Sequence, residues 1–340
     1  MTEEIERSRA SDSTIDIKLL NGSDARLRST IDFGAAFVIS GILAIVFRTM
    51  IAPIERVKLI LQTQASSQQI GKSKRAYSGV LNALVRIPRE QGFLSLWRGN
   101  LLNVCRYFPA QAINFSFYDV YYEIFRKIFE TRTIHSDVIL PFLSGGAVGL
   151  TSSALLYPLN FCNTRISVDI GDNKMIKRDF YGLRDCLSKV YKTDGYRGFY
   201  QGLSSAACGL ALYRSIYFGV YTFSKRLYTR KFMEDSQAPP FFVSLILAQS
   251  SSIFAISMTY PLDTLSRQKM LWSGRGTKHY VTVRQMISII LKKDGPIGFY
   301  KGISANLMST ICGALLLVTY DIIKKRFDRF VESKRTKSEN

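Results

Sequence analysis

Long runs of mainly apolar residues alternate with polar, basic connections along most of the chain. The first run, residues 31–52, has 22 residues, of which only Asp32 and Arg48 are charged. As a helix it would be roughly 33 Å long, which is enough to cross the apolar core of a bilayer. Similar runs begin near Leu101, Val138, Leu203, Phe241 and Ile303. The pattern therefore predicts an all-α membrane protein with six transmembrane helices.

A proline next to polar residues follows the first, third and fifth runs. Pro53, Pro158 and Pro261 are 105 and 103 residues apart, about a third of the chain. A second motif recurs in the same phase: a glycine, an aromatic residue five positions later, and another glycine two positions after that. Its members are Gly92, Trp97, Arg98 and Gly99, then Gly195, Tyr200 and Gly202, then Gly295, Tyr300 and Gly302. Two motifs in register predict a threefold repeat, with repeats at 31–130, 137–230 and 239–330 between polar tails at 1–30 and 331–340.

The net charge of +20 does not indicate a nucleic-acid-binding protein. The basic residues are spread over the connections, and they do not form one stripe interleaved with aromatic residues. The longer basic connections follow the odd-numbered runs, so they are expected on the negative side of the membrane. Residues 77–90 have apolar positions at helical spacing, which predicts a helix lying on the membrane surface.

The candidate chemistry does not indicate an enzyme, because no nucleophile, metal cluster or acid–base pair stands out. The five cysteines show no metal-ligand spacing and are expected to be buried, reduced thiols. The acidic start of the chain, with Glu3, Glu4 and Glu6, is unlike a transit peptide and predicts an uncleaved tail.

The repeated proline and glycine motifs resemble those of the mitochondrial carrier family over nearly all of residues 30–330. Within the family, PIERVKLILQTQ, RIPREQGFLSLWRGNLLNVCRYFPAQAINFSF and YRSIYFGVY are most similar to ADP/ATP carriers. The resemblance implies six helices in three pseudo-symmetric repeats with short matrix helices, in the mitochondrial inner membrane, with both termini in the intermembrane space. It implies cardiolipin as a bound lipid at the glycine–aromatic–glycine turns, although a plain helix cap explains any single turn equally well. It implies no other cofactor.

The same resemblance suggests a substrate site. Arg48 stands where ADP/ATP carriers have a phosphate-binding lysine, and Arg106 matches a phosphate-binding arginine. Tyrosines spaced four residues apart usually mean packing, but in the ADP/ATP carriers they line the cavity. The implied substrate-binding residues are Arg48, Arg106, Gly209, Leu210, Tyr213, Arg214, Tyr217 and Thr259. The third substrate arginine of the family is absent, because Ser309 occupies its position.

The family also closes each end of its cavity with a ring of ion pairs. The implied gate residues are Glu55, Lys58, Gln62 and Asp263 at the inner end, and Asp119, Lys225, Asp321 and Lys324 at the outer end. The inner pairs become Glu55 with Asn163, Asn160 with Ser266, and Asp263 with Lys58, so only the last is ionic. The outer ring also keeps one ionic pair, Asp119 with Lys225. Each lost pair removes on the order of 1 to 3 kcal/mol from a closed state.

Three hypotheses for function follow from these substitutions. The chain could be an ADP/ATP exchanger, supported by Arg48, Arg106 and the tyrosines. It could be a carrier for another anion. It could instead be a transport-inactive carrier fold kept as a structural subunit of a larger respiratory or ATP synthase complex, which would explain the weakened gates.

Overall fold

The computed structural model describes residues 41–42, 44–73, 76–129, 136–171, 177–232, 239–274, 281–315 and 318. The chain divides into two compact units, Met1–Arg48 and Thr49–Asn340. The described residues of the first unit are helical. The cavities and the contacts around them belong to the second unit.

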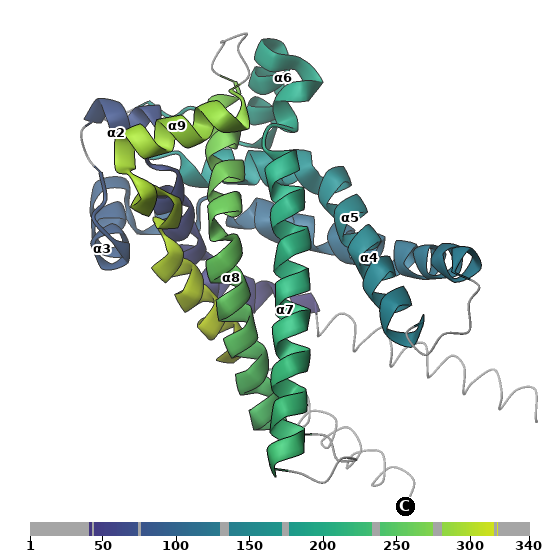
Figure 1. Cartoon of the computed structure of the whole chain (residues 1–340). Coiled ribbons are helices and arrows are strands. Elements are labelled where there is room, and N and C mark those ends of the chain that lie inside the picture. The colour runs from purple at the N-terminus through teal and green to yellow at the C-terminus, as the bar shows by residue number, and fades with distance from the viewer. Residues whose placement is uncertain are drawn as a thin grey trace, which may run out of the picture. The chain divides into compact units, whose positions relative to one another are not determined.

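The second unit is built of helices (Figure 1). Residues 49–63 and 303–315 are helical. Between them come α2 (Gln68–Ser73), α3 (Val80–Gln91), α4 (Asn100–Ile128), α5 (Ser136–Val168), α6 (Leu183–Phe199), α7 (Leu203–Phe232), α8 (Phe241–Trp272) and α9 (Val283–Asp294), with short 3₁₀ helices η1 (Phe93–Trp97) and η2 (Pro296–Tyr300). α4 packs on α5, and α7 packs on α8. The described residues contain no strand, and the predicted all-α fold is confirmed.

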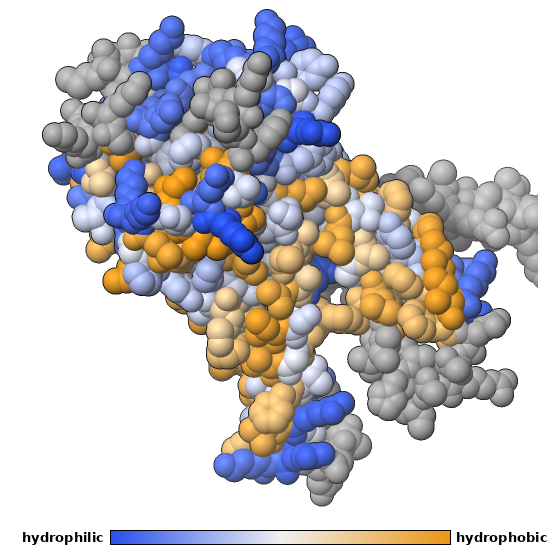
Figure 2. All heavy atoms as spheres, turned by 45° about the horizontal axis from the view of Figure 1, so that its top comes forward, coloured by the Kyte–Doolittle hydropathy of each residue, from blue (hydrophilic) through white to orange (hydrophobic). Residues whose placement is uncertain are grey.

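Two of the described helices are long and apolar enough to cross a membrane, residues 140–168 and α8. α4 and α7 have 29 and 30 residues, so they are long enough but more polar. The first and last predicted spans fall partly outside the described residues. Figure 2 shows apolar side chains over the sides of the helices and hydrophilic residues gathered towards their ends, as expected for helices that lie across a bilayer.

The last glycine of each repeated motif lies against the helix of the next repeat. A Cβ atom at Gly99 would lie 2.0 Å from Ser167 Oγ, and one at Gly202 would lie 2.5 Å from the carbonyl oxygen of Ser266. A Cβ at Gly302 would lie 3.0 Å from the carbonyl oxygen of Lys58 in the first repeat. The first repeat therefore meets the second, the second the third, and the third the first, so the three close into a ring.

The aromatic residue of each motif contacts the kinked helix of its own repeat. Tyr200 stacks on Tyr157, and Tyr300 stacks on Tyr260, with centroids 6.1 and 6.3 Å apart. Tyr157 and Tyr260 each stand directly before a kink proline. In the first repeat, the indole of Trp97 instead donates a hydrogen bond of 2.8 Å to the carbonyl oxygen of Thr49. These contacts place each motif beside a proline that interrupts the backbone hydrogen bonding of a helix.

Two predictions for the surface of the bundle need correction. The surface helix begins at Val80, three residues later than predicted, and its buried Ala83 and Ile87 pack with Val57 and Ile60. The cysteines are not uniformly buried. Cys162 and Cys186 are buried, but Cys105 and Cys208 are exposed and Cys312 is half-buried, because these three point outwards from their helices.

Candidate functional site

A cavity of about 290 Å³ lies among helices from all three repeats. Four predicted substrate residues line it: Gly209, Leu210, Tyr213 and Thr259. Three charged residues of the kink regions, Lys58, Asp263 and Arg267, also line it. We call this space the Tyr213 cavity. The structure thus brings predicted binding residues and predicted gate residues to one place.

Asp263 is the charged centre of this cavity. Lys58 Nζ lies 3.6 Å from its Oδ2 atom, so the ion pair expected between the first and third repeats is formed. Arg267, one helical turn further on, donates from Nε to Oδ1 and Oδ2 at 3.1 Å each. Gln62 donates to Oδ2 at 3.0 Å. One carboxylate therefore holds two cations and an amide, which ties α8 to the first helix of the unit.

The other two inner pairs differ from the prediction. Glu55 accepts a hydrogen bond of 2.8 Å from Asn103, not from Asn163. Ser266 bonds to the hydroxyl of Tyr157 at 3.2 Å, not to Asn160. Glu55 thus bonds within its own repeat, whereas the hydroxyl of Ser266 still bonds to the second repeat, through Tyr157 in place of Asn160.

Asn103 also determines the position of Arg106. Its Oδ1 atom accepts a hydrogen bond of 3.2 Å from Arg106 Nη2, while its amide nitrogen donates to Glu55. Arg106 therefore approaches the kink region through a buried asparagine. It does not line the Tyr213 cavity.

The predicted tyrosine face is a stacked column. Tyr213, Tyr217 and Tyr221 have centroids 6.0 and 6.1 Å apart, with ring planes within 14° of parallel. The hydroxyl of Tyr213 bonds to Ser252 Oγ on α8 at 3.1 Å. Only Tyr213 of the three lines the cavity.

Arg214 does not line the Tyr213 cavity, and its role in substrate binding stays a prediction. Its guanidinium donates from Nη1 to the carbonyl oxygen of Gly145 at 2.5 Å. It lies so close to Gly149 that a Cβ there would be 2.7 Å from Nη2. Gly145 and Gly149, expected to allow close helix packing, instead make room for this arginine between α7 and α5.

The two ends of the bundle differ. At the outer end Asp119 and Lys225 are both exposed, and no ion pair joins them in the described part of the chain. Asp321 and Lys324, the other outer gate residues, lie outside the described residues. The inner pair is therefore formed while the outer pair that can be described is open.

The remaining predicted residues are placed as follows. Arg48 belongs to the first unit, so its place in a binding site stays a prediction.

Arg98 donates from Nη1 to the carbonyl oxygens of Asp169 and Gly171, at 2.6 and 3.1 Å. Gly92, Gly195 and Gly295 have positive φ angles and open space where a Cβ would stand. Lipid binding at the motifs stays a prediction.

The structure adds cavity residues that the motif comparison missed. Arg267 and Asn306 both line the cavity, and neither is among the predicted binding or gate residues. Asn306 lies four residues after Gly302, as Asn103 lies four residues after Gly99. Aligning the repeats on their last glycine would have found this pair.

A threefold bundle of kinked helices around a polar cavity is the architecture of a solute carrier. The family described as "Mitochondrial carrier protein" matches residues 29–129, 135–232 and 237–330. The chain belongs to this family, whose members are multi-pass transporters of the mitochondrial inner membrane and not enzymes.

Individual relatives cover most of the chain. ADP/ATP translocase 4 of Mus musculus is 42% identical over 304 residues, covering 89% of this chain and 93% of the relative. ADP/ATP translocase 4 of Homo sapiens is 42% identical over 306 residues, covering 90% and 95%. ADP/ATP translocase 2 of Bos taurus is 43% identical over 300 residues, covering 87% and 98%.

Proposed function

We propose that this carrier exchanges ADP for ATP across the mitochondrial inner membrane by alternating access. The observation that carries the proposal is the Tyr213 cavity directly beside the formed Lys58–Asp263 pair. A cavity closed at one end, with the opposite pair open, is what alternating access requires of one of its two states. The similarity to proteins named ADP/ATP translocase supports a nucleotide as the solute.

The cavity has the parts that a nucleotide needs. Tyr213 offers an aromatic face beside Gly209 and Leu210, which suits the base. Lys58 and Arg267 share Asp263, so the three carry a net charge of +1, and Arg106 near the kink region adds further positive charge for the phosphates. The missing ion pairs of the two gate rings weaken both closed states. Exchange requires only that these two states remain close in free energy.

Cardiolipin is part of this proposal. A hollow of about 460 Å³ beside the first glycine–aromatic–glycine motif is lined by Gly92, Phe93, Trp97, Arg98 and Arg178 among others. Phe93 and Leu94 are exposed there. Apolar side chains beside arginines suit a lipid with an anionic headgroup.

We expect the purified protein, in vesicles containing cardiolipin, to exchange external labelled ADP for internal ATP. Arg106→Ala should lower the exchange rate by about 10- to 100-fold, because a charged hydrogen bond to substrate contributes roughly 1.5 to 3 kcal/mol. The matched control is Arg126→Ala near the end of the same helix, where the side chain lies far along α4 from the kink region. This control should exchange at the unaltered rate.

The other hypotheses give different results. Exchange of a smaller anion without exchange of nucleotides would replace the proposed solute. The absence of any anion exchange, together with co-migration with a respiratory or ATP synthase complex on a native gel, would instead establish the structural role. No observation on the described residues favours either alternative.

A further inference from the structure

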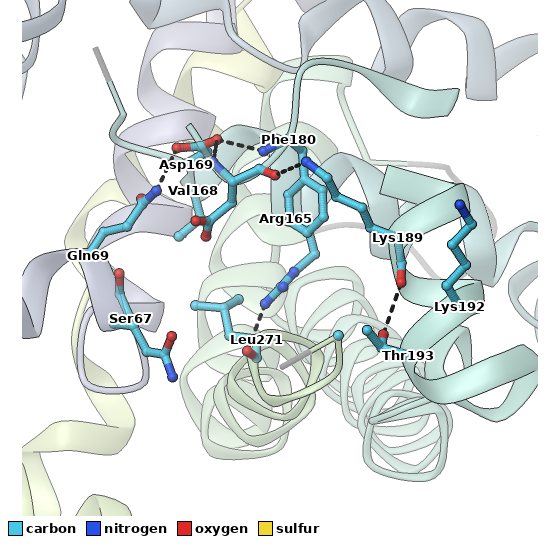
Figure 3. Close-up of a pocket in the computed structure, with 13 residues that line it drawn as sticks. Ser67, Gln69, Arg165, Val168, Asp169, Phe180, Lys189, Lys192, Thr193 and Leu271 are labelled. Carbon is cyan, nitrogen blue, oxygen red and sulfur yellow. Dashed lines mark hydrogen bonds between the residues drawn. The ribbon is translucent and has the colours of Figure 1, made fainter. Parts of the chain in front are cut away.

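A second cavity, of about 530 Å³, lies beyond the kinks, at the end of the bundle where α5 and α8 end. It is lined by parts of all three repeats, including Gln69, Arg165, Asp169, Lys189, Lys192 and Leu271 (Figure 3). It shares no lining residue with the Tyr213 cavity. We call it the Arg165 cavity.

Arg165 is a buried cation with too few partners. Its side chain is 9% exposed, and Nη1 donates to the carbonyl oxygen of Leu271 at 2.7 Å. Its guanidinium also lies over the ring of Phe180, 4.9 Å from the centroid. Its Nε atom is buried and has no hydrogen-bond partner in the structure. Because a buried, incompletely bonded charge is costly, such a group indicates a missing partner of opposite charge.

The fold itself does not require a cation at this position. The repeat-equivalent residues, seven positions after the kink proline, are Ile60 and Gln268. Gln268 is bonded inside the protein, since it accepts from Ser66 Oγ at 2.9 Å and donates to the carbonyl oxygen of Gln62 at 3.1 Å. The buried cation is therefore specific to the second repeat.

Two lysines on α6 add positive charge at the opening of the cavity. Lys189 is exposed and bonded to Asp185 at 2.8 Å. Lys192 is exposed, and among the described residues its ammonium group makes no hydrogen bond or ion pair. Figure 3 shows both lysines on the same side of Arg165.

The acids of the cavity do not cancel this charge. The carboxylate of Asp169 is bonded by Gln69 Nε2 and by the backbone amides of Gly171, Asp179 and Phe180, at 2.8 to 3.2 Å. Those four donors stabilise the charged carboxylate and occupy both of its oxygens. Partial burial and the neighbouring Asp169 raise the pKa of Asp179. With both acids charged, the three cations that line the cavity still leave it a net charge of +1.

We propose that the Arg165 cavity binds the phosphate group of an anionic ligand, at a site separate from the Tyr213 cavity. Arg165 supplies the buried donors, and Lys189 and Lys192 attract the anion at the opening. The phosphate comes either from a free solute or from a phospholipid headgroup. The site is independent of the proposed exchange, because it uses none of the same residues.

Trp272 allows this binding to be measured directly. It follows Leu271, and its indole donates to Ser66 Oγ, one residue from the cavity-lining Ser67. The chain has two tryptophans. Trp97→Tyr, which introduces the residue found at the equivalent positions 200 and 300, leaves Trp272 as the only one. In discs of neutral lipid, we expect inorganic phosphate to change its fluorescence saturably.

Substitutions that change the charge of a cavity residue test whether the fluorescence response comes from this cavity. Lys192→Gln should raise the half-saturating phosphate concentration at least threefold, and Asp179→Asn should lower it by a similar factor. Lys292→Gln is the matched control, because Lys292 also stands three residues before the first motif glycine of its repeat but lies outside the cavity. It should change nothing. Arg106→Ala should also leave this response unaltered, whether or not the protein exchanges nucleotides.

Comparing inorganic phosphate with anionic phospholipid in the discs distinguishes the two sources of the phosphate group. A response to inorganic phosphate that is weakened by Lys192→Gln and strengthened by Asp179→Asn supports a free anion. A response that follows the same order but occurs only in discs with anionic phospholipid supports a headgroup. No saturable response with either, or an equal effect of Lys192→Gln and Lys292→Gln, would overturn the proposal.

Discussion

Asp263→Asn is expected to destabilise the state in which the inner end is closed. The substitution leaves Lys58 and Arg267, whose side chains are 14% and 20% exposed, without their carboxylate. Removing one partner of a buried ion pair costs roughly 3 to 5 kcal/mol. Because Asp263 is itself 37% exposed, solvent screening reduces the expected loss in unfolding free energy to about 1 to 3 kcal/mol. Thermal unfolding in detergent, followed by tryptophan fluorescence, measures it.

The matched control for this prediction is Asp119→Asn. Asp119 is an exposed acid at the opposite end, without an ion pair to Lys225, so its loss should alter the melting temperature little. Lys58→Met tests whether Arg267 can hold Asp263 alone, and it should cost less than Asp263→Asn because one cation remains. Equal melting temperatures for Asp263→Asn and the unaltered protein would show that the ion pair contributes nothing to this state.

Gly99→Ala is expected to disrupt the junction between the first and second repeats. Gly99 has a φ angle of +91°, and its Cβ would lie 2.0 Å from Ser167 Oγ. The left-handed conformation costs a residue other than glycine about 1 to 3 kcal/mol, and overpacking adds about 1 to 3 kcal/mol. We expect a loss of folded protein, or a large fall in melting temperature.

Two further variants separate these causes. Gly92 also has a positive φ, +85°, but nothing lies within 4 Å of its Cβ position. Gly92→Ala should therefore show the strain of a positive φ without overpacking, although with a ψ of 154° in place of −13° at Gly99. Adding Ser167→Gly to Gly99→Ala removes the contacting side chain and should recover part of the lost stability. If Gly92→Ala and Gly99→Ala were equally harmful, close packing between repeats would not be the reason for the glycine.

Repetition in the sequence determined the all-α fold and the three repeats. Kink prolines spaced by a third of the chain, and glycine–aromatic–glycine motifs in the same phase, are local patterns of spacing. Each unit repeats the same helical arrangement, so the spacing is visible without knowing any long-range contact. The sequence also determined which ionic inner pair remains, because only Lys58 and Asp263 keep opposite charges at matching positions.

The tertiary structure decided where the other polar side chains find partners. Arg214 and Arg106 look alike in the sequence, as single cations in apolar helices. Arg214 lies against Gly145 and Gly149, whereas Arg106 bonds to Asn103. Likewise, the chain shows Arg165 at the end of a helix, but only the folded structure surrounds it with residues of three repeats. Spacing along one helix gives the direction of a side chain, and the neighbouring helices that supply its partners come from distant parts of the chain.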